Sequence, residues 1–251
     1  MQLPVLMPGA EPFFFRGGST ACLLIHGLTA SPQEMRPLAE HLALQGHTVY
    51  VPRLPYHGTT PVDLTRAGWN DWFLSALDAY YVLVSQCERV VVAGLSMGGV
   101  TALLLSAVAQ VSGVISLSTP MNLSGDARLR LARALWRMYP YFKKSNVGDS
   151  NHDPFWRGRY PVHPVRSLAE LVDYMAAVRP YLPKITCPAL LVHAQDDSSV
   201  PISNFHLIAQ EIGSTAWQVE FRNGGHVLTY SQHSHELNEL VSHFVDYCIE
   251  L

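Results

Sequence analysis

Short apolar runs alternate along the chain with longer segments in which apolar residues recur at the spacing of a helix. Runs rich in apolar and β-branched residues predict strands at residues 21–25, 48–51, 90–93, 111–117, 189–192 and 217–221. The run at 90–93 is apolar without a break, which is typical of a strand buried on both faces. This alternation extends from about residue 20 to 120 and from about 187 to the end. It predicts an α/β fold with a mostly parallel central sheet and helices on both faces.

Three helices have clear signals in the sequence. Ser31 and Glu34 have the spacing of a capping box, with a proline at the first helical position, and Gly46 ends the helix that follows. Residues 69–80 place aromatic and aliphatic side chains on one helical face, and residues 237–248 form another such stripe. Helices of this kind are expected to cover the faces of the sheet.

The segment 121–183 interrupts the alternation. It has helical character at 126–138 and again after Ser167, which together with Glu170 predicts a helix start. It carries ten of the 17 lysines and arginines but only five acidic residues. A structureless loop of this length is improbable in a compact domain. We therefore expect a core domain made of residues 1–120 and 184–251, with residues 121–183 as an inserted subdomain.

Composition excludes several classes of protein. Hydrophobic residues make up 48% and charged residues 15%, as in folded proteins, and the net charge of −3 argues against nucleic-acid binding. The apolar runs are far shorter than the roughly 18–20 residues that cross a bilayer. The N-terminus lacks the pattern of a signal peptide, so we expect a cytoplasmic protein with no stable membrane insertion. The four cysteines form no Cys-x-x-Cys pair, which favours reduced thiols over a disulfide framework or a metal site.

A Gly-Leu-Ser-Met-Gly motif at 94–98 follows the buried strand directly and precedes an apolar stretch, 100–108, that favours a helix. In this strand–turn–helix context the motif is typical of a nucleophile elbow, in which a sharp turn exposes the serine hydroxyl. Ser96 is therefore the predicted nucleophile, placed where the free N–H groups of a helix start stabilise negative charge. The alternative is a glycine-rich turn with an idle serine.

A serine hydroxyl needs a base, and the chain offers an acid and a histidine after later strands. His226 follows the strand 217–221 on a Gly-Gly turn, and Asp196 and Asp197 follow the strand 189–192. His226 would act as general base and then general acid, and one aspartate would fix its tautomer. The other aspartate would be a turn residue bonded to its own backbone. Six other histidines are expected to be packing or surface residues, namely His41, His47, His206, His233, His235 and His243.

The tetrahedral intermediate also needs hydrogen-bond donors for its oxyanion. The backbone N–H of Met97, next to the nucleophile, is one candidate. The backbone N–H of Leu28, in the loop after the strand 21–25, is the other, and the Leu28 side chain is free to line an acyl pocket. Leu28 and Met97 are thus the expected substrate-binding residues. The alternative for His26-Gly27 is an ordinary turn that ends a strand.

Five motifs in the same order resemble the α/β-hydrolase superfamily, and more narrowly the small bacterial carboxylesterases and monoacylglycerol lipases; they lie at residues 24–29, 55–58, 94–99, 197–201 and 225–226. In that family two residues usually separate the catalytic acid from a Val-Pro-like pair, so the resemblance implies Asp197 rather than Asp196. It also implies that residues 121–183 form a cap over the active site. The sequence departs from the family at Leu54-Pro55-Tyr56, where relatives often have a glycine.

The predicted function is that of a serine carboxylesterase, which hydrolyses small-molecule esters of short to medium chain length through a covalent acyl-enzyme. A monoacylglycerol lipase is the alternative; a thioesterase, an amidase, a C–C bond hydrolase and a non-catalytic binding module are more distant ones. We expect no cofactor, no metal and no nucleic-acid partner, and a monomer or homodimer. The aromatic side chains at 136–156 are expected either to pack the cap onto the core or to form an apolar lid, with the arginines at 128–137 in solvent.

Overall fold

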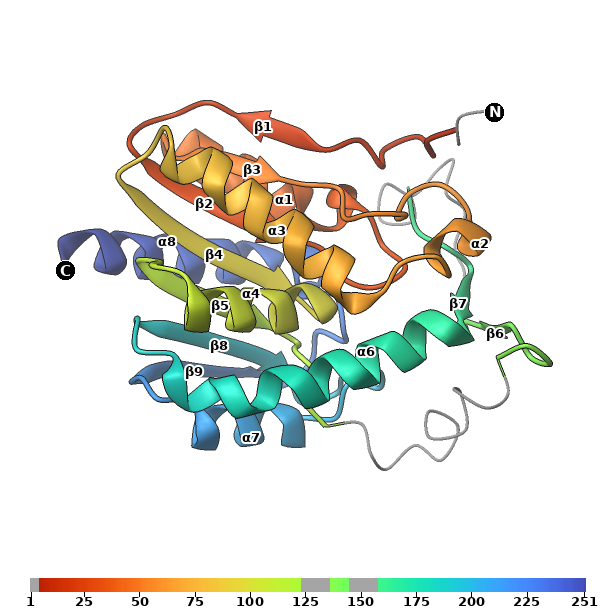
Figure 1. The fold of residues 1–251 in the computed structure, drawn as a ribbon. Coiled ribbons are helices and arrows are strands. Elements are labelled where there is room, and N and C mark those ends of the chain that lie inside the picture. Colours follow the sequence, from red (N-terminus) through yellow and green to blue (C-terminus); the bar gives the residue numbers. More distant parts are fainter. Residues whose placement is uncertain (1–4, 123–135, 145–157) are drawn as a thin grey trace.

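The computed structural model describes residues 5–122, 136–144 and 158–251. A seven-stranded sheet in the order β1-β3-β2-β4-β5-β8-β9 forms its centre (Figure 1). The strands are β1 (Phe13–Phe15), β2 (Thr20–Ile25), β3 (Thr48–Val51), β4 (Arg89–Leu95), β5 (Gly113–Leu117), β8 (Ala189–Ala194) and β9 (Ala216–Phe221). All pairs are parallel except β1 with β3. This sheet confirms the predicted α/β fold; β1, a run of three phenylalanines without alternation, gave no sequence signal.

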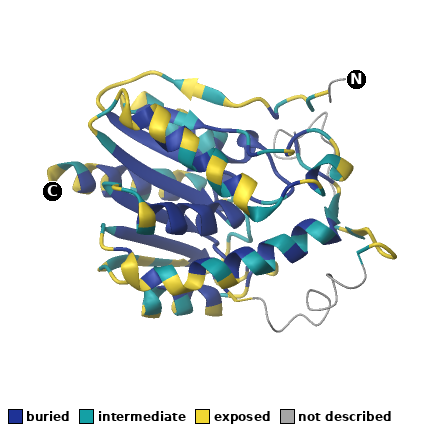
Figure 2. Ribbon diagram, viewed as in Figure 1, coloured by how far each residue is buried: buried dark blue, intermediate teal, exposed yellow. Residues whose placement is uncertain are grey.

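Every residue of β2, β5 and β8 is buried, as a strand between two helical layers requires (Figure 2). Alternate side chains of β2 enter different hydrophobic clusters. Leu23 and Ile25 pack into one cluster, with the helices at residues 69–84, 97–108 and 165–178. Cys22 and Leu24 pack into the other, with the helices at residues 36–44 and 234–250. The period of two in the strand therefore separates the two faces of the core.

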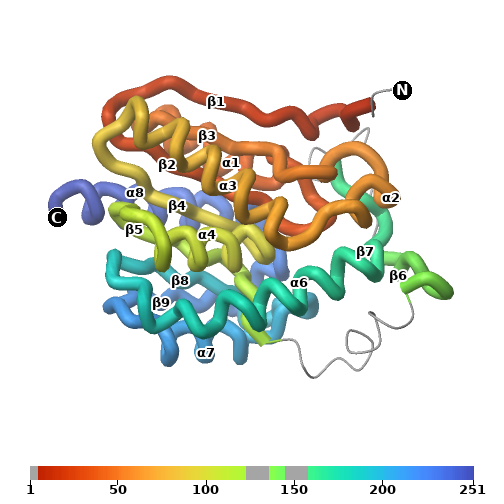
Figure 3. Tube along the Cα trace, viewed as in Figure 1, coloured from red at the N-terminus to blue at the C-terminus, as the bar shows by residue number. Residues whose placement is uncertain are grey.

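Two helical layers cover the sheet (Figures 1 and 3). One layer is α1 (Arg36–Leu44) and α8 (Ser234–Glu250), and the other is α3 (Trp69–Val84), α4 (Met97–Val108) and α6 (Val165–Val178). The shorter elements are η1 (Pro32–Met35), α2 (Pro61–Leu64), η3 (Arg179–Lys184), α7 (Ser203–Glu211) and η4 (Leu228–Tyr230). In the described residues, no helix is both long and apolar enough to cross a membrane.

The segment between β5 and β8 contains a two-stranded antiparallel sheet, β6 (Tyr141–Lys143) with β7 (Val162–Pro164), followed by α6. α6 begins at Val165, before the predicted start, because Ser167 does not cap it: Ser167 Oγ donates to the carbonyl of Leu64 instead. Glu170 likewise accepts a hydrogen bond from the N–H of Trp69. These contacts fix α6 to the loops around α2 and α3. Most of the helix predicted at 126–138 lies outside the described residues.

The predicted capping box at Ser31 and Glu34 is wrong. A short 3-10 helix, η1, leads into α1, and the Ser31 side chain makes no capping hydrogen bond. The Glu34 carboxylate is 3% exposed and binds Gly27 and Arg159 rather than the helix start. A buried carboxylate is better stabilised by a guanidinium than by one backbone N–H, which explains the difference.

Candidate active site

Ser96 lies in the turn between β4 and α4, at the carboxyl edge of the sheet. Its φ of 57° and ψ of −121° are strained for a residue with a side chain, and its N–H donates to the carbonyl of Leu117 at 2.8 Å. A methyl group on Gly94 would clash with the backbone of Gly98, and one on Gly98 would clash with the carbonyl of Ile25. Both glycines are therefore required sterically, and together they let the chain turn sharply at the serine.

The loop at residues 26–29 passes close to Ser96. A methyl group on Gly27 would lie 3.2 Å from Ser96 Cβ, so this loop borders the serine directly. The N–H of Gly27 donates to Glu34 Oε2 at 2.7 Å. By contrast, among the described residues the N–H groups of Leu28 and Met97 donate to no acceptor. Two N–H groups without an acceptor among the described residues thus belong to the loop that borders Ser96 and to the residue that follows Ser96.

His226 and Asp197 form a hydrogen-bonded pair at the same edge of the sheet, after β9 and β8. The distance from His226 Nδ1 to Asp197 Oδ2 is 2.7 Å; the aspartate side chain is 0% exposed and the imidazole 21%. Asp197 Oδ1 accepts from the N–H groups of Ser199 and Val200 at 2.8 and 2.9 Å. The carboxylate therefore accepts the Nδ1 proton, which leaves Nε2 of His226 as the basic nitrogen.

Burial alone would raise the pKa of Asp197. Hydrogen bonds from His193 and His226, the charge of His226 and the N–H of Val200 outweigh it and hold the pKa of this carboxyl well below its usual range. Asp197 is therefore ionised throughout the neutral range. Ser96 Oγ makes no hydrogen bond to any described residue, His226 included.

His193 is a second imidazole beside Asp197. Its Nε2 donates to the carbonyl of Val200 at 2.9 Å and lies 3.4 Å from Asp197 Oδ2, in a side chain that is 1% exposed. Sequence analysis did not single out His193. Its position four residues before Asp197, at the end of β8, is the signal that could have identified it.

Asp196 has a different role from the predicted one. Its Oδ1 accepts a hydrogen bond of 2.9 Å from the N–H of Gly225, in the loop that carries His226, and not from its own turn. Gly224 and Gly225 have φ values of 157° and 60°, which place this loop in conformations that favour glycine. The two adjacent aspartates therefore both act on the histidine loop, Asp196 through the backbone and Asp197 through the imidazole.

Glu34 connects three segments around the site. Its carboxylate binds the N–H of Gly27 and, at 2.6 Å, the guanidinium of Arg159, which lies between β6 and β7. Its carbonyl accepts a hydrogen bond of 2.7 Å from Thr229 Oγ1, near His226. The sequence did not indicate this connection, because the spacing of Glu34 from Ser31 predicted a capping box instead.

His26 and His57 are buried next to one another, with ring centroids 4.9 Å apart. Burial lowers the pKa of His26 to about 4 and that of His57 well below its usual value. Nε2 of His26 accepts the N–H of Leu54, and its Nδ1 donates to the carbonyl of Gly27. Both imidazoles are therefore neutral and support the backbone of the loop at 26–29 and of the one at 54–58.

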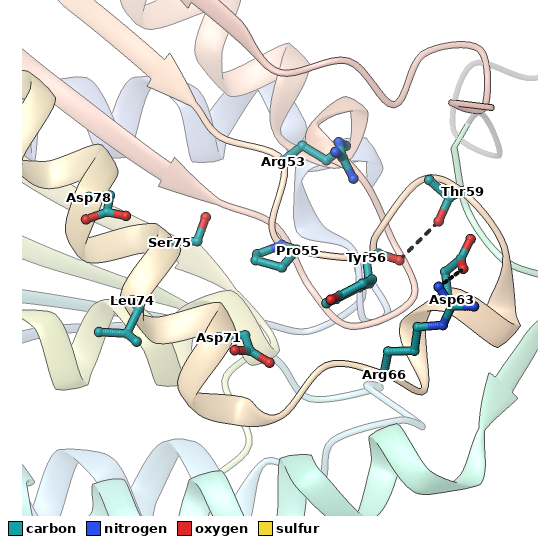
Figure 4. Close-up of a pocket in the computed structure, with 10 residues that line it drawn as sticks. All are labelled: Arg53, Pro55, Tyr56, Thr59, Asp63, Arg66, Asp71, Leu74, Ser75 and Asp78. Carbon is teal, nitrogen blue, oxygen red and sulfur yellow. Dashed lines mark hydrogen bonds and ion pairs between the residues drawn. The ribbon is translucent and has the colours of Figure 1, made fainter. Parts of the chain in front are cut away.

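A surface groove of about 580 Å³ lies away from this site (Figure 4). It is lined by charged, polar and a few apolar side chains of the loop after β3, of α2 and of α3: Arg53, Pro55, Tyr56, Thr59, Asp63, Arg66, Asp71, Leu74, Ser75 and Asp78. Neither Ser96, Asp197 nor His226 lines it. Within the described ranges, no group of three His, Cys, Asp or Glu side chains could hold a metal ion.

Two curated relatives match nearly the whole chain. The thermostable monoacylglycerol lipase of Bacillus sp. (strain H-257) is 36% identical over 230 residues, which is 91% of this chain and 90% of the relative. The carboxylesterase of Bacillus subtilis (strain 168) is 27% identical over 239 residues, or 94% and 96% of the two chains.

Solved structures agree with these sequence relatives. A chain described as one of two metagenome-derived lipolytic enzymes is 30% identical, with a TM-score of 0.89, and covers 97% of this chain and 100% of its own. The monoacylglycerol lipase of Paleococcus ferrophilus has the same fold, with 19% identity and a TM-score of 0.75 over 96% and 98% of the two chains. A model of the alpha/beta hydrolase family matches residues 22–240. With the fold, the nucleophile-elbow geometry and these relatives in agreement, the chain belongs to the alpha/beta hydrolase family.

Proposed function

We propose that this protein is a serine carboxylesterase that hydrolyses short- to medium-chain esters with a triad of Ser96, His226 and Asp197. The observation that carries the proposal is the 2.7 Å hydrogen bond between His226 and the buried Asp197, at the strand edge where the strained Ser96 turn lies. It fixes the imidazole tautomer whose Nε2 is free to take the serine proton.

In the proposed reaction Ser96 Oγ attacks the ester carbonyl while its proton passes to His226 Nε2. The carbonyl π electrons become an oxyanion, which the free N–H groups of Leu28 and Met97 stabilise. When the intermediate collapses, the ester C–O bond breaks and the His226 proton goes to the leaving alcohol. Water then repeats the cycle on the acyl-enzyme, with His226 again the base, and releases the carboxylic acid.

Residues 121–183 form the proposed cap. Arg159 supports the assignment, because it contacts Glu34 beside the loop at 26–29, whereas α6 packs with α3 and α4 in the layer that covers the sheet. Leu28 and Met97 are the proposed substrate-lining residues below it. We further propose a cytoplasmic location and a monomeric or dimeric state; all four cysteines are unpaired, as expected of a reducing compartment.

A monoacylglycerol lipase is the second candidate, because the relative at 36% identity carries that name whereas the carboxylesterase is 27% identical. The ratio of kcat/KM for 1-monolauroylglycerol to that for methyl laurate separates the two. A ratio well above one supports the lipase, and a ratio near or below one supports a general carboxylesterase.

Hydrolysis of p-nitrophenyl butyrate and labelling by a fluorophosphonate probe test the chemistry itself. We expect Ser96→Ala to abolish both, and His226→Ala to reduce turnover as severely, because triad residues act as a unit. Ser85→Ala, an exposed serine just after α3, is the matched control and should behave like the wild type. Labelling that persists in Ser96→Ala contradicts the proposal.

A further inference from the structure

Lys144 is a cationic group beside the proposed active site that the reaction does not use. Its Nζ donates a hydrogen bond of 2.7 Å to Thr29 Oγ1, and Thr29 directly follows Leu28. The backbone N–H of Lys144 donates to the carbonyl of Pro161, which ties the end of β6 to the start of β7. The ammonium is thereby held against the same loop that carries the proposed oxyanion donor.

The Lys144 ammonium lacks an ionic partner in the described part of the chain. No carboxylate there lies within 4.0 Å of its Nζ, and nearby Glu34 is already bound to Arg159 and to the N–H of Gly27. An ammonium has three N–H donors, of which the Thr29 hydroxyl takes one. Burial, and then the charge of Arg159, lower the pKa of Lys144 to about 7. A partly buried cation with donors to spare favours an anionic ligand.

His163 provides a second unused polar atom in the same place. It lies on β7, paired with Phe142 of β6, and its Nδ1 is buried with no hydrogen-bond partner among the described residues. Burial, and then the positive charges of Lys144, Arg159 and His226, lower the pKa of His163 to about 4. The imidazole is therefore neutral and within electrostatic reach of both Lys144 and the proposed catalytic base.

We propose that Lys144, Thr29 and His163 form a subsite for a carboxylate group carried by the ester substrate. The inference rests on the proposed function and adds a substrate class, namely half-esters and other esters with a free carboxylate. A neutral alcohol fits less well, because the described residues put two cations at the subsite, Lys144 and Arg159, against the single carboxylate of Glu34. The carboxylate would accept hydrogen bonds from the remaining Lys144 N–H groups. It would also accept one from His163 when that imidazole carries its proton on Nδ1.

Matched ester pairs test the subsite and show whether it binds the acyl half or the alcohol half of the substrate. Monomethyl glutarate against methyl butyrate places the charge on the acyl half, and acetoxyacetate against ethyl acetate places it on the alcohol half. For at least one pair we expect Lys144→Met to lower kcat/KM for the charged ester about tenfold more than for the neutral ester, mainly through KM, as the loss of a charged hydrogen bond does. Lys144→Arg should recover part of the loss, and Lys143→Met, its exposed neighbour, should change neither ratio.

Equal losses for charged and neutral esters in both pairs, or no loss in either, overturn the subsite. A binding measurement does not depend on turnover: glutarate should raise the Tm of the Ser96→Ala protein more than dimethyl glutarate does, and Lys144→Met on that background should remove the difference. If the wild type hydrolyses neutral esters but glutarate gives no such shift, only this inference fails. If the wild type reacts with neither neutral esters nor fluorophosphonate, the proposed function fails, and the glutarate shift alone then decides the subsite.

Discussion

Glu34 Oε2 accepts a hydrogen bond of 2.7 Å from the N–H of Gly27, one residue before the proposed oxyanion donor Leu28. The other oxygen of this buried carboxylate binds Arg159 at 2.6 Å. One side chain therefore links the loop beside Ser96 to the inserted segment 121–183. Its position suggests that it sets the direction of the Leu28 N–H without contacting substrate.

Glu34→Ala is expected to lower kcat by about 10- to 100-fold with a smaller change in KM, because a displaced oxyanion donor acts on the transition state. It also removes the carboxylate that binds the guanidinium of Arg159 at 2.6 Å, so the free energy of unfolding should fall by about 3 kcal/mol. Glu34→Gln, which keeps an acceptor for the Gly27 N–H, should recover part of kcat. The exposed Glu40, which pairs with Arg36, is the control, and Glu40→Ala should change neither quantity measurably. An unchanged kcat in Glu34→Ala contradicts the positioning role.

The adjacent aspartates should differ sharply when each is replaced by asparagine. Asp197→Asn puts an amide where the His226 imidazole needs an acceptor, so kcat should fall by about 10³- to 10⁴-fold. Asp196→Asn keeps an oxygen that accepts the Gly225 N–H, so its kcat should stay within a few-fold of the wild type. Asp196→Ala removes this acceptor and should cost more than Asp196→Asn but far less than Asp197→Asn. Steady-state kinetics on p-nitrophenyl butyrate measures all three variants. A milder effect at Asp197 than at Asp196 would mean that Asp196, and not Asp197, is the catalytic acid.

A third prediction concerns the turn at Ser96. Gly98→Ala forces a methyl group against the carbonyl of Ile25, a backbone atom that no side-chain rotation can remove. We expect the free energy of unfolding to fall by more than about 3 kcal/mol, as overpacking against a fixed backbone does. At Gly18, whose added methyl would meet its nearest atom at an ordinary 3.4 Å, the same substitution should be close to neutral. Urea unfolding of both variants measures the difference, and equal stabilities would show that the turn tolerates a side chain.

The sequence predicted those features that depend on local pattern. The apolar, β-branched strand runs, the elbow motif and the order of Ser96, Asp197 and His226 are local or ordered along the chain. The sheet, its parallel pairing and the Asp197–His226 contact agree with them. Features that depend on a partner distant in sequence were missed. Glu34 bonds a residue 125 positions away, and Asp196 one that is 29 away, so neither contact has a periodicity that a single sequence displays.

Burial of His26 gives the protein a stability that depends on pH. The folded pKa, about 4, lies below the 6.5 of a free imidazole because burial disfavours the protonated ring. The contribution of His26 is therefore complete above pH 6.5 and is lost as the pH falls towards 4, by about 1.4 kcal/mol per pH unit and about 3 kcal/mol in all. His57, whose pKa is lowered in the same direction, adds a loss of the same sign.

Replacement of His26 removes this proton linkage. Urea unfolding measures the difference in free energy of unfolding between the wild type and His26→Gln. As the pH is lowered from 6 to 4.5, this difference should decrease by about 1.4 kcal/mol per pH unit, because only the wild type has to keep the His26 imidazole unprotonated in its core. His243→Gln, an exposed histidine on α8, should give a gap that does not change with pH. A difference in free energy of unfolding that stays constant with pH for His26→Gln would contradict this prediction. It would mean that the His26 imidazole takes up a proton in the folded state as readily as in the unfolded chain. The neutral pair of His26 and His57 beside the loop at 26–29 would then be wrong.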